Sequence, residues 1–221
     1  MEQNSKPNSN IKYYEVAKAL IHALELKDPY TSGHSFRVYK MAKELGKLFD
    51  LEEEKQFSLE GGALLHDIGK IGIRDSILLK PASLTFEEFR IMKTHVVLGA
   101  DIISQCDSLK HCLEPVLFHH ERIDGKGYPH GLKGEEIPLI AKITCVVDSY
   151  DAMTTNRVYT PARTAEEALK ELQRCSGAQF DHEVIEAFSD WWQDKHQKQE
   201  NIIEVVSADE LNLNLDECPS S

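Results

Sequence analysis

Apolar residues recur at helical spacing along most of the chain. Five segments of the first half show this spacing: residues 11–27, 34–48, 52–65, 85–104 and 109–120. Three more follow a glycine-rich stretch, and they begin at Ile137, Thr164 and Asp181. Apolar positions three and four residues apart are typical of amphipathic helices, and no stretch alternates as a half-buried strand would. The pattern therefore predicts an all-α fold, a single helical bundle.

Local signals place several helix starts. Residues 85–88 (Thr-Phe-Glu-Glu) and 164–167 (Thr-Ala-Glu-Glu) have the spacing of a capping box, in which a hydroxyl and a carboxylate satisfy free backbone N–H groups. Asp181 is placed to cap the last helix, and Thr31 or Ser32 is a candidate cap for the second. These signals support the helix boundaries that the periodicity predicts.

Length and composition favour one domain. A chain of 221 residues, 41% hydrophobic and 28% charged, can build one sizeable core. We expect residues 1–10 to be a flexible N-terminus, residues 11–196 to form the domain and residues 197–221 to be an acidic tail. No apolar run approaches the ~20 residues of a membrane helix, and the N-terminus lacks the apolar core of a signal peptide. A cytoplasmic protein without a membrane segment is expected.

Cysteine content and charge narrow the function. The five cysteines include no C-x-x-C pair, so neither a disulfide framework nor a zinc ribbon is predicted; they are Cys106, Cys112, Cys145, Cys175 and Cys218. The net charge of −12 argues against duplex nucleic acid as a partner, because such binding relies on basic residues that neutralise phosphates. A small phosphorylated substrate is compatible with this charge, since metal ions can supply positive charge locally.

The stretch from His119 to Pro129 (HHERIDGKGYP) carries distinctive chemistry. Neighbouring helix residues point about 100° apart, so two adjacent histidines face one centre only if it lies close to the backbone. A metal ion, held about 2 Å from each imidazole nitrogen, is such a centre. The two glycines and the proline predict a turn that approaches another group closely or needs positive φ. On its own, a polar helix end with a glycine-rich loop explains this stretch equally well.

Other histidines and acids lie at comparable places, on or at the end of predicted helices with apolar neighbours. A carboxylate there is costly to bury unless it is paired or bound to a metal, and bundles build metal sites from inward-facing side chains. The candidate ligands are His34, His66, Asp67, His95, His119, His120 and Asp148. Mixed imidazole and carboxylate ligation suits Fe, Mn, Zn, Ni or Co. Seven ligands suffice for two ions if one carboxylate bridges them. Asp67 is the natural bridge, because it lies between His66 and the other histidines in the sequence.

These residues resemble the HD-GYP subgroup of the HD-domain metal phosphohydrolases. The resemblance covers about residues 14–190 and is carried by residues 66–72 (HDIGKIG), His95, residues 119–129 with Ile137-Pro138 after them, residues 148–155 (DSYDAMTT) and residues 179–181 (QFD). It implies an α-helical domain with two or three metals. It also implies hydrolysis of cyclic dinucleotides, chiefly cyclic di-GMP, to linear pGpG or GMP.

The resemblance leads to expected roles around the centre. Metals about 3.5–4 Å apart can activate a water and stabilise both the attacking and the leaving oxygen. Beside the bridging Asp67, we expect Lys70 to neutralise charge that builds on the phosphoryl oxygens. Tyr128 with the glycine loop is expected to shape a guanine pocket, and Asp151 and Arg157 are expected to contact the substrate. Gly69 and Gly72 are expected to allow a close backbone approach after a helix end.

The chain departs from its relatives at two positions. Some relatives have a Glu four residues before the position of His34 that helps to hold a third metal, whereas this chain has Tyr30. After Asp151 the family often reads Asp-Arg-Pro-Tyr-Arg, and this chain reads Asn-Arg-Val-Tyr-Thr. A basic phosphate contact is thus missing at Thr160, and Arg157 must do more. We expect two divalent transition metals, iron or manganese first, with nickel, cobalt or zinc as alternatives.

Two other functions fit the same residues. One is a phosphodiesterase for another cyclic dinucleotide, such as cyclic GMP-AMP, on the same centre. The other is a non-catalytic receptor that binds the nucleotide and signals through a protein partner. The intact ligand set argues against the receptor, because a receptor has no need of a bridging carboxylate. A protein partner or a homodimer is compatible with either enzyme.

Overall fold

The computed structural model describes residues 7–31, 33–156 and 161–197. Over these ranges the chain consists of helices and loops, and no strand forms. Two isolated bridges join loop residues, Asp124 with Lys133 and Ser176 with Phe180. The predicted all-α class is confirmed. None of the described helices is long and apolar enough to cross a membrane.

The helices follow one another along the chain, and the segment between Phe118 and Gly134 is a long connection. In order they are α1 (Pro7–Lys27), η1 (Pro29–Thr31), α2 (His34–Lys47), α3 (Glu53–Leu65), η2 (Ile68–Gly72), α4 (Asp75–Leu78), α5 (Phe86–Met92), α6 (His95–Ser104), η3 (Asp107–Cys112), α7 (Leu113–Phe118), η4 (Gly134–Glu136), α8 (Leu139–Thr154), α9 (Ala165–Arg174) and α10 (His182–Gln197). Helix α1 begins four residues before the predicted start, with a proline that suits the first turn. The predicted acidic tail lies almost wholly outside the described residues.

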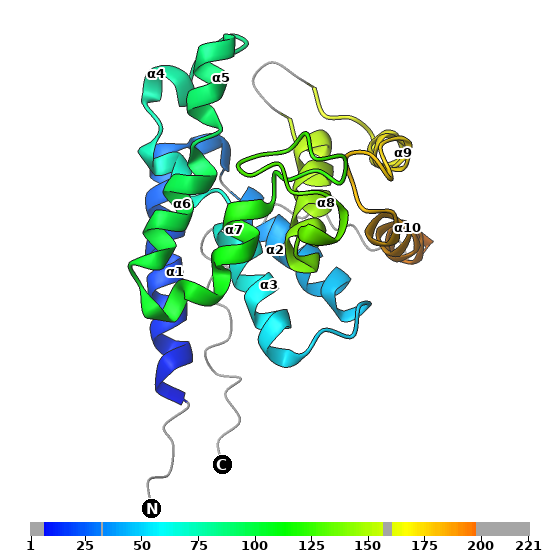
Figure 1. Cartoon of the computed structure of the whole chain (residues 1–221), viewed down its shortest axis with the longest axis horizontal. Helices are drawn as coiled ribbons and strands as arrows, with labels where there is room; N and C mark the ends of the chain where they lie inside the picture. The colour runs from blue at the N-terminus through cyan, green and yellow to red at the C-terminus, as the bar shows by residue number, and fades with distance from the viewer. Residues whose placement is uncertain (1–6, 32, 157–160, 198–221) are drawn as a thin grey trace, which may run out of the picture.

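Two apolar clusters form the core, and α2 and α3 contribute to both. The first cluster joins them to α8, α9 and α10 through fully buried side chains such as Ile143 and Phe188. The second joins them to α1, α6 and α7 through Leu24, Ile103 and Val116. Figure 1 shows α1 along one side of the molecule, α9 and α10 along the other, and α2, α3, α7 and α8 between them. Helices of both clusters therefore reach the centre of the molecule.

The single helix predicted over residues 85–104 is two helices, so that prediction was wrong. Helix α5 ends at Met92 and α6 begins at His95. Between them, the backbone N–H and the hydroxyl of Thr94 both donate to the carbonyl of Ile91, at 2.9 and 2.6 Å. Such a side-chain bond competes with the helical ladder. The break lets the ring of His95 start a new helix.

The helix predicted over residues 109–120 is also divided. A 3-10 helix runs to Cys112, and α7 ends at Phe118, so His119 and His120 follow the helix rather than extend it. Pro115 gives the physical reason for the division, because it has no N–H to donate and its ring crowds the preceding turn. The paired histidines still lie at the C-terminal end of the segment, as expected.

The predicted caps are partly right. Both capping boxes form, at Thr85 and at Thr164, and Asp181 Oδ1 accepts from the backbone N–H groups of the last helix. Thr31 does not cap α2, because its hydroxyl donates to the carbonyl of Asp28 at 2.6 Å. Gly33, with φ 69°, stands at that helix start instead, and Ser32 lies outside the described residues. The short helix α4 lies between the segments 52–65 and 85–104, outside the ranges predicted to be helical.

Candidate metal centre

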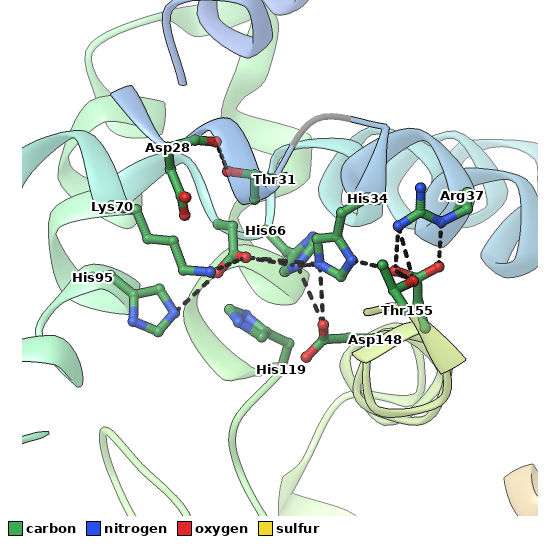
Figure 2. A network of polar contacts seen from close by, with 12 residues as sticks. Asp28, Thr31, His34, Arg37, His66, Lys70, His95, His119, Asp148 and Thr155 are labelled. Carbon is green, nitrogen blue, oxygen red and sulfur yellow. Dashed lines mark hydrogen bonds and ion pairs between the residues drawn. The ribbon is translucent and has the colours of Figure 1, made fainter. Parts of the chain in front are cut away.

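Most candidate ligands come from the ends of separate helices, and Figure 2 shows that His34, His66, His95, His119 and Asp148 point toward one place. His34 is the first residue of α2, His66 follows α3, His95 is the first residue of α6, and His119 follows α7. Asp148 projects from α8, and all seven ligands fall into three overlapping groups: His34, His66 and Asp148; His66, Asp67 and His119; His95, His119 and His120. Within each group the donor atoms lie within 4.8 Å of one another. The structure thus brings together every predicted ligand.

Asp67 lies between two sets of histidines. Its Oδ2 is 3.3 Å from His66 Nε2, and its Oδ1 is 3.4 Å from His95 Nε2. The two carboxylate oxygens therefore face different imidazoles. On the side of His66, the Nε2 of His34 lies 3.2 Å from Asp148 Oδ1. This arrangement suits a carboxylate shared by two ions.

The imidazole rings are oriented by backbone carbonyls. The Nδ1 atoms of His66 and His95 lie 2.7 and 2.8 Å from the carbonyls of Ala63 and Met92, and His119 Nδ1 lies 3.0 Å from that of Pro115. A carbonyl accepts only, so Nδ1 carries the proton and Nε2 presents a lone pair to the centre. This second contact is typical of metal-bound histidine.

Two of these lone pairs are buried without a partner. Among the described residues, His95 Nε2 and His119 Nε2 make no hydrogen bond, although each is shielded from solvent. His95 Nε2 faces a carboxylate oxygen of Asp67, which is also an acceptor. A cation between two acceptors that face each other in a buried site satisfies both of them. The residues present therefore fit a bound metal.

The charges around the centre are strongly coupled. Burial lowers the pKa of His119 and of His120, the latter to about 3, so both rings are neutral and able to ligate. Burial also acts against protonation of His66, but Asp67 and Asp148 outweigh it and raise the pKa of His66 to about 10. The two carboxylates thus favour a positive charge beside them, either a proton on His66 or a cation. Metal binding displaces protons of this kind, because an imidazole ligates in its neutral form.

A cavity of about 540 Å³ opens from this centre. On one side it is lined by ligands and by Lys70, whose Nζ lies 2.5 Å from Asp67 Oδ2. On the other side it is lined by apolar side chains of the α4–α5 region: Ile77, Leu78, Leu79, Ala82, Leu84, Phe89 and Met92. Cavities of this size, mostly apolar with a few converging polar groups, hold small ligands.

The matching family model is that of the HD domain, over residues 18–184. The chain belongs to the HD-domain family. The resemblance to its HD-GYP subgroup is confirmed by relatives named as cyclic di-GMP phosphodiesterases. The dyad His66-Asp67 lies at the heart of the ligand set described above, at the junction of α3 and η2.

Curated proteins and a solved structure resemble this chain over most of its length. A cyclic di-GMP phosphodiesterase of Thermotoga maritima is 44% identical over 79% of this chain and 48% of the relative. A 3'3'-cGAMP-specific phosphodiesterase of Vibrio cholerae is 33% identical over 80% of this chain and 34% of the relative. The crystal structure of a cyclic GMP-AMP specific phosphodiesterase in V. cholerae shares the fold, with a TM-score of 0.66 and 18% identity over 90% of this chain and 53% of that chain. The chain spans less than half the length of these curated relatives.

In this HD domain, Asp151 contacts protein groups with both carboxylate oxygens. Its Oδ2 lies 2.6 Å from His34 Nδ1, and Arg37 donates to both oxygens at 2.6 and 2.9 Å. Figure 2 shows Arg37 and Thr155 beside this contact. The sequence analysis assigned no role to Arg37, although its spacing three residues after His34 on one helix indicates the same face. The substrate contact expected for Asp151 stays a prediction.

Tyr128 lines the cavity but is already packed on protein groups. Its ring stacks against His120 with centroids 4.8 Å apart, and the ammonium of Lys93 lies 5.0 Å from its centroid. Its backbone N–H donates to the carbonyl of His120 at 3.1 Å. These contacts position His120 beside His95. The guanine contact expected for Tyr128 stays a prediction, and Arg157 and Thr160 lie outside the described residues.

Glu121 was not assigned a role from the sequence. It is 2% exposed, and its carboxylate accepts from the backbone N–H groups of His130, Gly131 and Leu132, at 2.7–3.1 Å. The loop around Gly127 folds back onto the same residue, since a Cβ at Gly127 would lie 2.5 Å from Glu121 Cα. An acid at the start of a glycine-rich loop is the sequence signal that indicates such an anchor, because loop N–H groups need acceptors.

Proposed function

We propose that this HD domain hydrolyses cyclic di-GMP by metal-dependent cleavage of a phosphodiester bond, yielding linear pGpG, GMP or both. The observation that supports it most directly is the carboxylate of Asp67, placed between histidines with unpartnered lone pairs. Two relatives, 44% and 37% identical, are named as a cyclic di-GMP phosphodiesterase and a probable cyclic di-GMP phosphodiesterase. Their names and this geometry point to the same chemistry.

We propose two divalent transition metals at the centre, with iron or manganese first and nickel, cobalt or zinc as alternatives. His34, His66, Asp67 and Asp148 would hold one ion, and Asp67 would be shared with a second ion held by His95, His119 and His120. Bound metals of this kind activate water and stabilise charge on the attacking and leaving oxygens.

Lys70 is placed to act on the reacting phosphate. It lines the cavity, and its ammonium contacts Asp67. Burial lowers its pKa, but the charge of Asp67 outweighs burial and raises it, so Lys70 stays protonated. An ammonium fixed beside the bridging carboxylate can donate to a phosphoryl oxygen as negative charge grows there. Its position is set in advance by the contact with Asp67.

Arg37 and Asp151 have a positioning role in this proposal. The carboxylate of Asp151 holds Nδ1 of His34 as the proton donor, which leaves Nε2 free toward Asp148. Arg37 holds the carboxylate in turn. Tyr128 supports His120 from its other side. Contacts from Tyr128, Asp151 and Arg157 to the substrate remain part of the proposal.

A second candidate substrate is cyclic GMP-AMP, since three relatives 30–33% identical are named as specific for 3'3'-cGAMP. The test is turnover of cyclic di-GMP, 3'3'-cGAMP and cyclic di-AMP by anaerobically purified protein, followed by chromatography and paired with elemental analysis. The expected result is bound metal and preferential conversion of cyclic di-GMP. Preferential conversion of 3'3'-cGAMP would favour the second candidate, and tight nucleotide binding without conversion would favour a receptor.

A further inference from the structure

The cavity has a second end that the metal chemistry does not use. Away from the ligands it is lined by side chains of α4, α5 and the loop between them, and two of these are Phe89 and Lys80. Phe89 is 45% exposed although it lines the cavity. Tyr128, the other benzene-type ring among the lining residues, is stacked on His120. The ammonium of Lys93 lies 4.8 Å from the centroid of the Phe89 ring. The remaining exposed surface of this ring is available to a ligand.

The edge of this apolar end carries a paired charge. Lys80 Nζ lies 2.5 Å from Glu88 Oε2, and both side chains are about one-quarter exposed. Glu88 is fixed at the start of α5, because its carboxylate also accepts from the backbone N–H of Thr85 at 2.7 Å. A cation and an anion are thus held side by side at the border of an aromatic surface. Lys80 lines the cavity, and its contact with Glu88 holds that carboxylate next to the lining.

This combination matches the chemistry of guanine. A base stacks on an aromatic ring whatever its identity. Guanine places an acceptor, O6, next to a donor, the N1–H group, so adjacent ammonium and carboxylate groups complement its edge. Adenine places a donor, the N6 amino group, where guanine has O6, and its N1 accepts. The same pair therefore opposes adenine with like groups.

We propose that this end of the cavity is the subsite for the second base of the cyclic dinucleotide, in which Phe89 is the stacking surface and the pair Lys80–Glu88 selects guanine. The inference rests on the proposed function, which places the scissile phosphate and the first base at the metal centre. One cavity joins the two ends. The subsite binds the distal half of the substrate and takes no part in the chemistry.

The stacking surface is tested with Phe89→Ala against Phe86→Ala. Phe86 starts the same helix, is 77% exposed and does not line the cavity, so it is a matched control. The readout is kcat/KM for cyclic di-GMP divided by that for bis(p-nitrophenyl) phosphate, a small phosphodiester without nucleobases. Phe89→Ala lowers this ratio roughly 5- to 150-fold, the range for loss of one stacked base. An unchanged ratio, or an equal fall in Phe86→Ala, overturns the stacking role.

The selection of guanine by the pair Lys80–Glu88 is tested with Lys80→Met, which keeps the aliphatic stem and removes the charge. The control is Lys55→Met, since Lys55 also pairs across two elements, with Glu114, but lies outside the cavity lining. The ratio of kcat/KM for cyclic di-GMP over cyclic di-AMP falls roughly 5- to 150-fold in Lys80→Met, the scale of one good base contact. Glu88→Gln, which keeps a capping-box residue, shifts the ratio in the same direction. A ratio that is unchanged in both variants overturns the role of Lys80 and Glu88 in selecting guanine.

The products formed from cyclic GMP-AMP show independently which of its two bases occupies the distal subsite. If the distal subsite holds guanine, the wild-type protein opens one phosphodiester bond in preference and yields mainly one of the two linear isomers. Lys80→Met reduces that excess, whereas equal amounts of both isomers from the wild type contradict a guanine-selective subsite. A wild-type protein that cleaves bis(p-nitrophenyl) phosphate but no cyclic dinucleotide refutes the proposed function itself. Cleavage of cyclic di-GMP with no effect of Phe89→Ala or Lys80→Met refutes the subsite alone.

Discussion

The ammonium of Lys70 lies 2.5 Å from Oδ2 of Asp67. The group proposed to neutralise phosphoryl charge and the carboxylate proposed to bridge the metals are thus in direct contact, three residues apart at the start of η2. The 3-10 turn from Asp67 to Lys70 closes with a backbone bond of 2.9 Å, which fixes their relative position. Each can therefore be altered separately to distinguish charge stabilisation from metal binding.

Lys70→Ala is expected to lower kcat for cyclic di-GMP by about 100-fold or more, the scale for loss of one preorganised charge-stabilising group. Metal content is expected to stay at the wild-type level, because Lys70 is not a ligand. Steady-state kinetics with elemental analysis measures both, and Lys110→Ala, which removes an exposed ion pair with Asp107, is the control. Loss of metal, or a change in KM alone, would contradict the assigned role.

Asp67→Asn is expected to abolish hydrolysis and to reduce metal content, since a neutral amide cannot bridge two cations as a carboxylate does. The helical fold is expected to persist, as measured by far-UV circular dichroism. Asp101→Asn, on the exposed face of α6, is the control for a carboxylate lost elsewhere. Near wild-type turnover and metal content in Asp67→Asn would refute the bridge.

Asp151→Asn and Arg37→Met are expected to weaken metal binding by about 10- to 100-fold, the usual effect of losing a group that orients a ligand. The physical reason is that Asp151→Asn removes the charge of the acceptor that holds the Nδ1 proton of His34, and Arg37→Met removes the guanidinium that holds this acceptor in place. Chelator competition measures the affinity, and Arg90→Met, which breaks the exposed pair with Glu87, is the control. If Asp151→Asn raises KM with metal affinity unchanged, Asp151 contacts the substrate instead.

The wild-type protein is expected to hold about two metals per chain. A third cation needs a further anionic ligand to offset repulsion, and the position where some relatives place one is Tyr30, a phenol with a reference pKa near 10. The side chain of Tyr30 lies outside the described set. Elemental analysis of anaerobically prepared wild type and Tyr30→Glu measures the stoichiometry. Three tightly held metals in the wild type would refute this expectation, and a third appearing only in Tyr30→Glu would support it.

Gly69→Ala is expected to destabilise the fold by about 1–3 kcal/mol, the usual cost of overpacking. A Cβ at Gly69 would lie 1.8 Å from the carbonyl oxygen of His95 and 2.4 Å from the amide of Gly99, and backbone cannot move aside easily. Gly72→Ala is the control, because its Cβ would meet only the side chain of Leu98, at 2.8 Å. Thermal unfolding is expected to separate the two variants by several degrees. Equal melting temperatures would show that α6 can shift away from η2.

The clustering of the candidate ligands could be predicted because each of them is a histidine or an aspartate beside apolar neighbours. His34, His66 and His95 carry that signal whatever the exact helix boundaries. The close approach expected at Gly69 is also present, against the backbone of α6. Periodicity and residue type were enough for these features, since both are local properties of the chain.

The divided helices could not be predicted from periodicity. Residues 85–104 keep their apolar spacing across the break, and the break is made by the two bonds of Thr94 and by packing of α6 on η2. The partners of Asp151 and Glu121 were missed for a related reason. Arg37 is 114 residues from Asp151, and the N–H groups that Glu121 accepts belong to a folded loop. Contacts between segments that are distant in the sequence cannot be recognised from the local spacing of apolar residues.

The ligands belong to helices of different halves of the core. Asp148 comes from α8 in the first apolar cluster, and His95 and His119 come from the α6–α7 side in the second. The proposed ions would therefore act as a cross-link between the halves, and saturation about 1,000-fold above the dissociation constant adds about 4 kcal/mol to folding stability. Without enough metal, a larger fraction of the protein would be unfolded and degraded by proteases, and the molecules that remain would turn over less substrate. Metal supply would then set how much of the protein persists, and cyclic-dinucleotide levels would follow the metal status of the cell.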